Sequence, residues 1–418
     1  MKTLAECRAC GAPKPLTFME MGDHPPANAF VARERVAEPQ PAFPLSAQAC
    51  LSCGLIQVAD NVPADFFRDY LYVPSAAARM SVHFGALAER LVAQADGGLI
   101  VDIGCNDGLL LSACRERGGK VLGVDPAANL AVLAKARGVD VVTEYFGPEI
   151  ADRLRREHGR AAVIVTTNTF NHIDDLHGFM DGVSRLLSDD GAFVIETPWA
   201  RDLLEHNEFD TIYHEHVSEF SLLSIERLAQ GVGMEIADVE RSTVHGGSLR
   251  TTIRRPGDWR PTAAVAETFA AERAGGMLEA ETYAAFARRV DAIGAELRAT
   301  LADLKTQGLR VAGYGAPAKG CTLLHYFDIG PETLDFLIDR STLKQGLYSP
   351  GKKIPILGPD AIAERRPDVL LVLAWNFFDE IRDQQSAFLE AGGRFLVPLP
   401  SPAFVGPGAA RQADAQTV

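Results

Sequence analysis

The middle of the chain alternates short apolar runs with amphipathic stretches, the pattern that strands and helices give in an α/β domain. The apolar runs predict strands over 99–103, 120–124, 139–144, 162–168 and 191–196, and the first amphipathic stretch predicts a helix over 109–117. Strands that alternate with helices pair in parallel, so the pattern predicts a doubly wound sheet. Ligands of such sheets lie beyond the carboxyl ends of the strands.

A second alternation follows nearer the C-terminus. Apolar runs at 309–312, 334–338 and 369–373, with a helix that begins at Ala318, predict another Rossmann-like α/β domain, and the Ala/Glu/Arg-rich stretch 263–306 before it has helical periodicity. We therefore divide the chain into an N-terminal module (1–62), a helical connection (63–97), a first α/β domain (98–255), a helical linker (256–307), a second α/β domain (308–405) and a disordered tail (406–418).

Composition limits the classes of function. The 418 residues carry a formal net charge of −14, without a basic cluster, so nucleic acid is not expected as the main partner. Neither an N-terminal apolar segment nor a run of about 20 apolar residues is present, so we expect no export and no membrane span. The composition predicts a cytoplasmic enzyme, which we expect to be a monomer.

Four of the seven cysteines form two pairs, Cys7-x-x-Cys10 and Cys50-x-x-Cys53. Each pair presents two thiolates at a tight turn, and four thiolates suit a structural zinc ion, which keeps no open position for catalysis. A disulfide or a redox pair is the alternative, which the lack of an export signal disfavours. The spacing therefore predicts a structural Zn²⁺ site in the N-terminal module.

The run 99–108, Leu-Ile-Val-Asp-Ile-Gly-Cys-Asn-Asp-Gly, is a strand that leads into a glycine-rich turn. Gly104 and Gly108 let the backbone turn tightly beneath a ligand. Asp125 ends the next strand, about 20 positions further on, where an acidic residue can bind the two hydroxyls of a ribose. The turn and Asp125 together predict a nucleoside-containing cofactor.

The polar residues of this turn distinguish between cofactors. The dinucleotide pattern GxGxxG is absent, and the turn carries Asn106 and Asp107 after Asp102. The two carboxylates would repel a pyrophosphate and attract a sulfonium and an ammonium group. The turn is similar to the S-adenosylmethionine turn of class I methyltransferases, and a nucleotide-binding or purely structural βαβ unit is the alternative.

Further polar and aromatic residues fall at the carboxyl ends of the predicted strands. Asn168 ends the fourth strand and Glu196 the fifth, and Phe146 follows the third, where its ring could stack on an adenine. Because the carboxyl ends meet at one edge of the sheet, we expect these residues to line the cofactor and substrate sites.

Two histidine clusters fall near the same edge. His172 follows the fourth strand, and the segment Tyr213-His-Glu-His216 follows the fifth. The histidines and Glu215 could ligate zinc or iron, although metal-binding histidines more usually stand at i and i+4 on a helix. A histidine beside a carboxylate is better suited to a general base, because its pKa lies near neutrality.

The second α/β domain has its own glycine turn, 313–320, Gly-Tyr-Gly-Ala-Pro-Ala-Lys-Gly. Gly313 and Gly315 form the turn, and backbone N–H groups at the start of the following helix can cradle a phosphate beside Lys319. Here the charge is positive, so we predict a nucleotide diphosphate site, with a non-binding helper domain as the alternative.

In this order the motifs resemble the sugar C-methyltransferases that act on nucleotide-linked 4-keto-deoxysugars. The resemblance covers nearly the whole chain: the cysteine pairs, 102–108, 213–216, 245–250, 313–320, Asp339-Arg340, 344–346, 348–351, 354–356 and Trp375-Asn376. It implies a zinc module, a central class I methyltransferase domain and a C-terminal Rossmann-like domain that holds the nucleotide sugar. The cofactors implied are S-adenosylmethionine and structural Zn²⁺.

The resemblance also implies the reaction, methylation of carbon 3 beside a 4-keto group. His216 is the first choice as base, although sequence alone does not rank it above His172 or His214. Tyr213 or His172 would stabilise the enolate oxygen, and Glu215 would support a histidine or bind a sugar hydroxyl. The cofactor residues implied are Asp102, Gly104, Asn106, Asp107, Gly108, Asp125, Phe146 and Asn168. The substrate residues are Tyr72, Glu196, His245, Gly246, Ser248, Gly315, Lys319, Lys344 and Asn376.

Three alternatives stay open at this point. An NAD-dependent sugar-nucleotide oxidoreductase or epimerase is disfavoured by the missing GxGxxG pattern, and a non-catalytic zinc-bearing module is disfavoured by the histidine cluster. Methylation of a sugar oxygen or nitrogen would need no enolate. The expected substrate is a nucleotide-diphosphate sugar, with thymidine diphosphate as the default because most of the resembled family uses it.

Overall fold

A computed structural model describes residues 4–60, 78–242 and 244–407 of the chain. Contacts group these residues into two compact units, each assembled from several stretches of sequence. The first unit comprises 1–18, 47–202 and 215–282, and the second comprises 19–46, 203–214 and 283–418. The six-segment division made from the sequence stays a prediction.

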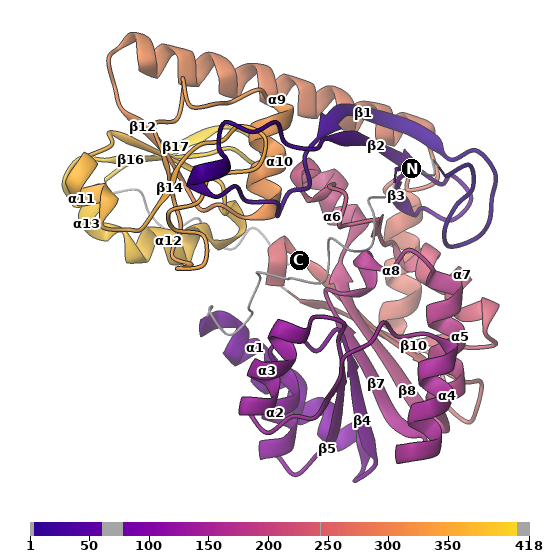
Figure 1. Ribbon diagram of the computed structural model, residues 1–418. Coiled ribbons are helices and arrows are strands. Elements are labelled where there is room, and N and C mark those ends of the chain that lie inside the picture. The colour runs from indigo at the N-terminus through magenta and orange to yellow at the C-terminus, as the bar shows by residue number, and fades with distance from the viewer. Residues whose placement is uncertain (1–3, 61–77, 243, 408–418) are drawn as a thin grey trace. The chain divides into compact units, whose positions relative to one another are not determined.

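The first unit is built on a seven-stranded sheet of order β10-β11-β8-β7-β4-β5-β6 (Figure 1). The strands β4 to β8 are parallel, and β10 and β11 extend the sheet as an antiparallel pair that the sequence had not predicted. The strands are β4 (Leu99–Ile103), β5 (Lys120–Val124), β6 (Val141–Val142), β7 (Ala161–Thr167), β8 (Leu187–Pro198), β10 (Glu235–Ser242) and β11 (Ser248–Arg254).

Helices cover both faces of this sheet because its strands bury side chains alternately on either side. Ile100 packs with helices α1 and α2, whereas Val101 lies in the core on the side of α4 and α5. Figure 1 shows the two layers. The helices are α1 (Ala78–Ala95), α2 (Leu109–Glu116), α3 (Ala128–Ala136), α4 (Pro148–His158), α5 (Leu176–Leu186), α6 (Ala200–Glu205), α7 (Leu222–Gly231) and α8 (Ala263–Ala274).

A smaller four-stranded sheet, β1-β2-β3-β9, contains the N-terminal strands β1 (Leu16–His24), β2 (Phe43–Ala49) and β3 (Ile56–Val58). Its fourth strand, β9 (Ser218–Glu219), comes from a distant part of the sequence. β9 pairs with β3, with Ile56 opposite Glu219. This pairing attaches the segment that follows His216 to the N-terminal module.

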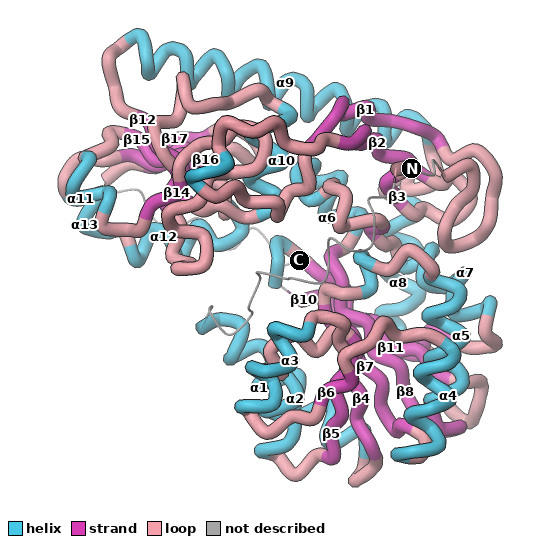
Figure 2. Tube along the Cα trace, viewed as in Figure 1, coloured by secondary structure: helices cyan, strands magenta, loops and turns pink. Residues whose placement is uncertain are grey.

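The second unit contains a six-stranded sheet of order β14-β13-β12-β15-β16-β17, in which β17 runs antiparallel (Figure 2). The long helix α9 (Ala280–Thr306) precedes it. The other elements are β12 (Val311–Tyr314), α10 (Ala318–Tyr326), β13 (Leu337–Ile338), β14 (Ile356–Leu357), α11 (Ala361–Arg365), β15 (Val369–Val372), α12 (Phe378–Gln384), α13 (Ser386–Glu390), β16 (Arg394–Val397) and β17 (Ala403–Val405).

The predicted mixed α/β class is confirmed, and the main differences are at strand ends. The strand expected over 139–144 shortens to Val141–Val142, because Val139 instead closes α3 by donating its N–H to the Ala134 carbonyl. The tail beyond residue 407 and residues 63–77 of the predicted helical connection lie outside the described residues. No helix within the described ranges is both long and apolar enough to span a bilayer.

Candidate functional site

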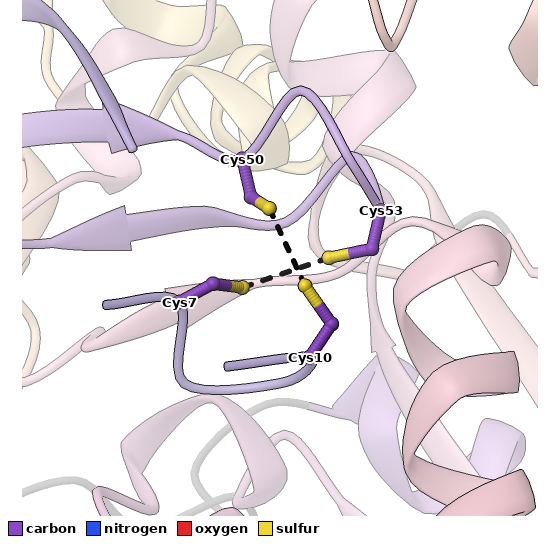
Figure 3. Close-up of side chains that lie close together, drawn as sticks. All are labelled: Cys7, Cys10, Cys50 and Cys53. Carbon is purple, nitrogen blue, oxygen red and sulfur yellow. Dashed lines mark hydrogen bonds between the residues drawn. The ribbon is translucent and has the colours of Figure 1, made fainter. Parts of the chain in front are cut away.

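The four cysteines of the N-terminal module converge on one point (Figure 3). Their Sγ atoms all lie within 4.8 Å of one another, with Cys7 3.6 Å from Cys53 and Cys10 3.5 Å from Cys50. A tetrahedral ion with Zn–S bonds of about 2.3 Å separates its sulfur ligands by about 3.8 Å, so the cluster fits zinc.

The ionisation of the cluster also favours a cation. Hydrogen bonds from the Cys53 and Cys7 thiols lower the pKa of Cys50, whereas the neighbouring Cys50 raises the pKa of Cys53. Four adjacent thiols cannot all ionise unless a positive charge compensates them. The donor set therefore matches a structural zinc ion.

The glycine turn between β4 and α2 closes around Asp125. The N–H of Asn106 donates to Asp125 Oδ2 at 2.9 Å, and the N–H of Ala127 donates to Oδ1 at 2.9 Å. Gly104 has φ of +80°, and a Cβ there would lie 2.1 Å from Thr169 Oγ1, so only glycine fits. Backbone hydrogen bonds thus hold the Asp125 carboxylate in a fixed position against the glycine turn, and the two together form the candidate cofactor cradle.

The other two carboxylates of the turn are buried. Asp107 forms an ion pair with Arg137 at 3.2 Å. Asp102 is 2% exposed, and burial, with the nearby Asp125, raises its pKa from 3.8 to about 8. Within the described residues its Oδ1 has no hydrogen-bond partner. A buried carboxylate with one oxygen unsatisfied suits a cationic ligand group beside it.

A pocket of about 810 Å³ lies beside Asp125, at the carboxyl ends of β5 and β6. It is lined by Pro126, Ala128, Thr143, Glu144, Tyr145, Gly147, Pro148, Glu149 and Ile150. Phe146, predicted to stack on an adenine, does not line it, because its ring packs edge-on against Phe179 at 5.3 Å. Tyr145, which lines the pocket, is better placed to contact a planar ring.

Asn168, at the end of β7, has a positive φ of 51°, a conformation that asparagine tolerates. Its Oδ1 is buried without a partner among the described residues. Its backbone N–H donates to the Glu196 carbonyl at 2.8 Å, which joins the ends of β7 and β8.

His172 and His216 are brought together, with ring centroids 4.9 Å apart and the rings perpendicular. His216 Nδ1 lies 3.0 Å from the carboxylate of Glu219, which is 2% exposed. Because a carboxylate accepts, Nδ1 carries the proton and Nε2 is the basic nitrogen. Burial and the neighbouring His216 lower the pKa of His172 to about 3, so its ring is neutral near pH 7.

Glu219 is the carboxylate that sequence reasoning missed. We predicted Glu215 as the support for a histidine, and Glu215 is buried, but the carboxylate found at His216 Nδ1 is that of Glu219. The spacing of three residues between His216 and Glu219 was the sequence feature from which Glu219 could have been predicted.

The other two residues of the Tyr213–His216 segment belong to the second unit. Tyr213 is 8% exposed. His214 is buried, its Nε2 lies 3.0 Å from the Pro44 carbonyl, and its ring packs edge-on against Phe43. These contacts give His214 a structural role and leave His216 and His172 as the candidate bases.

Glu196, predicted to bind substrate, is held in an ionic cluster of the first unit. His83 lies 2.6 Å from its Oε1, and Arg250 donates to its Oε2 at 2.7 and 2.9 Å. The hydrogen bond from His83 and the charge of Arg250 outweigh burial and lower the pKa of Glu196. Glu196 therefore stands ionised, with both oxygens already engaged.

The remaining predicted substrate residues of the first unit lie before or within β11. Ser248 is fully buried and its hydroxyl donates to the Val244 carbonyl at 3.1 Å. Gly246 ends a short 3-10 turn (Val244–Gly246) with φ of +99°. The side chain of His245 and the whole of Tyr72 lie outside the described residues.

The glycine turn of the second unit repeats the arrangement of the first. Asp339, after β13, accepts from the N–H of Ala316 at 2.8 Å and from the N–H of Ser341 at 2.8 Å. Gly315 has φ of +89°, and a Cβ there would approach Ala374 at 2.8 Å. Lys344 donates to the Ala316 carbonyl at 2.8 Å and lies 3.8 Å from Asp339, so its charge is partly compensated.

Lys319 begins α10 beside an aromatic ring. Its Nζ lies 4.3 Å from the centroid of Trp375, whose indole N–H donates to Asp210 at 2.9 Å. Asp210 is fully buried, and burial raises its pKa to about 6. Asn376 lies in the adjacent 3-10 turn (Trp375–Phe377) and is half-buried.

Family models match three successive parts of the chain. They are described as a zinc binding domain over residues 7–67, a methyltransferase domain over 77–239 and a C-methyltransferase C-terminal domain over 243–400. The predicted order of zinc module, methyltransferase domain and C-terminal domain is thus confirmed, and the oxidoreductase and non-catalytic alternatives are wrong.

Similar proteins include the C-methyltransferase NovU of Streptomyces niveus, 39% identical over 96% of this chain and 97% of that protein. A ubiquinone biosynthesis O-methyltransferase of Xylella fastidiosa is 26% identical over 24% of this chain and 42% of that protein. A magnesium protoporphyrin IX methyltransferase structure from Synechocystis, with bound S-adenosylmethionine, aligns at a TM-score of 0.33 and 15% identity over 42% of this chain and 79% of that one. From the full-length match to NovU and the three domain matches, the chain belongs to the family of S-adenosylmethionine-dependent, zinc-containing C-methyltransferases.

Proposed function

We propose that this C-methyltransferase acts on carbon 3 of a nucleotide-linked 4-keto-deoxyhexose. The observation that carries the proposal is the contact of His216 with Glu219 at 3.0 Å, beside His172. Carbon must lose a proton before it can accept a methyl group, and a histidine supported by a carboxylate is a base for that step. A 4-keto group is what makes the hydrogen on carbon 3 acidic enough to remove.

The roles of the residues follow from this arrangement. His216 Nε2 takes the proton from carbon 3, and Glu219 stabilises the imidazolium that forms. The Tyr213 hydroxyl donates a hydrogen bond to the enolate oxygen, because the single N–H of the neutral His172 ring already donates to the Glu215 carbonyl. S-adenosylmethionine supplies the methyl group to the carbon nucleophile.

The cofactor would be held by the first glycine turn. Asp125 would bind the ribose hydroxyls, the pocket beside Tyr145 would take the adenine, and Asp102 would lie beside the charged methionine end. The fit rests on the unpartnered buried oxygens of Asp102 and Asn168 and on the glycine-only turn.

We expect Asp125→Ala to weaken S-adenosylmethionine binding by a factor of about 10² or more, because two charge-assisted hydrogen bonds of about 1.5–3 kcal/mol each are lost. Isothermal titration calorimetry measures the affinity. Asp339→Ala is the matched control, since Asp339 makes the same backbone contacts in the second unit. Unchanged affinity in Asp125→Ala would show that Asp125 does not bind the ribose hydroxyls.

Asp102 predicts a pH dependence of cofactor binding. The pKa of Asp102 in the folded protein is about 8, above its ordinary value of 3.8. Without ligand, the folded protein therefore retains a proton that the unfolded chain loses. As a result, Asp102 lowers the stability of the fold as pH rises from about 4 to 8. A cationic ligand favours the ionised form, so binding at pH 7 releases about one proton and tightens toward pH 8. Calorimetry in buffers of different ionisation enthalpy measures this proton release. The Asp102→Asn variant has no such proton, so the release measured with it gives the contribution of the ligand alone, which is subtracted from that of the parent protein. Equal release from both proteins would exclude Asp102.

In the second unit, the start of α10 and Lys319 would bind the diphosphate of the sugar nucleotide, while Asp339 orders the turn. Lys344 and Asn376 are further candidates for substrate contacts. The thymidine diphosphate form is the first substrate to test.

The direct test is to incubate the protein with S-adenosylmethionine and a panel of 4-keto-6-deoxyhexose nucleotides and to analyse the products by mass spectrometry. A gain of one methyl group on carbon 3 is expected. Methylation on oxygen or nitrogen, recognised by fragmentation, would replace the proposal. Loss of deuterium from carbon 3 in the absence of the methyl donor would distinguish methylation on carbon from methylation on oxygen or nitrogen.

A further inference from the structure

Arg8 lies between Cys7 and Cys10 in the first cysteine turn, and its side chain is directed into the protein, 2% exposed. Its Nε donates to Asp174 Oδ1 at 3.0 Å, and its Nη1 donates to the carbonyls of Val58 at 2.6 Å and Val217 at 3.2 Å. Burying a guanidinium is costly unless its donors are satisfied, so these acceptors fix its place.

Two of the three acceptors of Arg8 belong to the segments that carry the candidate bases. Val217 directly follows His216, and Asp174 stands two residues after His172. One side chain of the zinc module therefore connects both histidine segments, whose rings lie 4.9 Å apart.

The second cysteine turn and β3 also contact the segment that follows His216. The N–H of Val58 also donates to the Val217 carbonyl at 3.1 Å, and β3 pairs with β9. The Ser221 hydroxyl donates to the Cys53 carbonyl at 3.1 Å. Backbone groups around 217–221 are thus hydrogen-bonded to residues that the cysteine cluster orders.

We propose that Arg8 is a positioning residue for the methyl transfer. The metal-bound turn 7–10 fixes Arg8, and Arg8 fixes the separation of the His216 and His172 segments. The zinc module thereby contributes to the geometry of the base without touching the substrate. This inference rests on the proposed function only in taking His216 as the base.

The test compares zinc-loaded Arg8→Met, Arg8→Lys and the parent enzyme. We expect Arg8→Met to keep its zinc, its affinity for S-adenosylmethionine and its KM, while kcat falls about 10- to 100-fold, because displacement of a catalytic group by about 1 Å costs up to about 10² in rate. Arg8→Lys, which retains a charged donor, should recover part of kcat. Arg185→Met is the control, since Arg185 also pairs with two carboxylates but on the surface.

Hydrogen–deuterium exchange of the backbone gives a readout that does not depend on turnover. Peptides covering 168–174 and 214–221 should lose protection in Arg8→Met and keep it in Arg185→Met. If Arg8→Met destabilises the whole chain, Asp174→Asn provides the milder variant, because it removes only the charge that pairs with Arg8, at an exposed site. A loss of protection in the same two peptides, with a smaller fall in kcat, is expected.

The outcomes separate this inference from the proposed function. Unchanged protection, or a kcat equal to that of the parent enzyme, would overturn the role of Arg8. A parent enzyme that exchanges no hydrogen at carbon 3 of the 4-keto substrates would instead overturn the proposed reaction, while loss of protection in Arg8→Met would still support the connection between zinc module and histidines. If Arg8→Lys recovers none of the lost kcat, and KM rises by the same factor as kcat falls, Arg8 has only a general structural role.

Discussion

The His216→Asn variant is expected to bind S-adenosylmethionine and the sugar nucleotide as the parent enzyme does, and to lose turnover by a factor of about 10² to 10⁴. Asparagine can still donate to Glu219, so the local hydrogen bond is kept, but it cannot accept a proton near pH 7. The decisive measurement is loss of label from carbon 3 of a deuterated 4-keto sugar nucleotide, followed without methyl donor.

Two companion variants sharpen this prediction. Glu219→Gln should slow exchange less than His216→Asn, because the base remains and only its charge support is lost. Tyr213→Phe should also have a smaller effect if its hydroxyl only polarises the ketone, because the base His216 remains. Exchange in His216→Asn as fast as in the parent enzyme would make His172 the base.

Cys50→Ser is expected to remove the zinc, about one ion per chain in the parent protein, and to destabilise the N-terminal module. Zinc binding contributes about 10–16 kcal/mol in small zinc-finger peptides, so losing one thiolate of four is a large effect. Elemental analysis measures the metal and thermal unfolding measures the stability. S-adenosylmethionine affinity should change little, because the cofactor cradle is formed by β4, α2 and Asp125.

Cys321→Ser is the matched control, a buried cysteine of the second unit that is not part of the cluster. It should keep the full zinc content. Zinc retained in Cys50→Ser, or lost on substitution of His172 or His216, would contradict the four-cysteine assignment.

The elements that local sequence determines were predictable. β4, β5 and β7 each follow from a β-branched run bounded by glycine or polar residues, and the turn at Gly104 follows from a backbone that only glycine allows. The β10–β11 pair was missed although a local signal was present: β11 alternates buried and partly exposed positions, the pattern of an antiparallel strand. β9 was missed because its two residues form a strand only by pairing with the distant β3.

The candidate site, too, was predictable only in part. The residue types at the sheet edge and in the cysteine pairs were predictable, because each chemistry needs particular side chains at particular spacings. Their partners were not: Glu196 was expected to bind substrate, yet His83 and Arg250 already contact both of its carboxylate oxygens. Such pairings depend on packing between residues far apart in the chain, which a local pattern does not encode.

The pairing of β3 with β9 has a consequence for synthesis of the chain. At about 5–20 residues per second, roughly 8 to 32 s separate the emergence of Val58 from that of Glu219 on the ribosome. During this interval the nascent chain presents β3 as an open strand edge, which is a template for aggregation. The interval of synthesis between β3 and β9 is therefore the stage at which the chain is most exposed to strand pairing with another chain, and it ends only when Ser218 and Glu219 emerge.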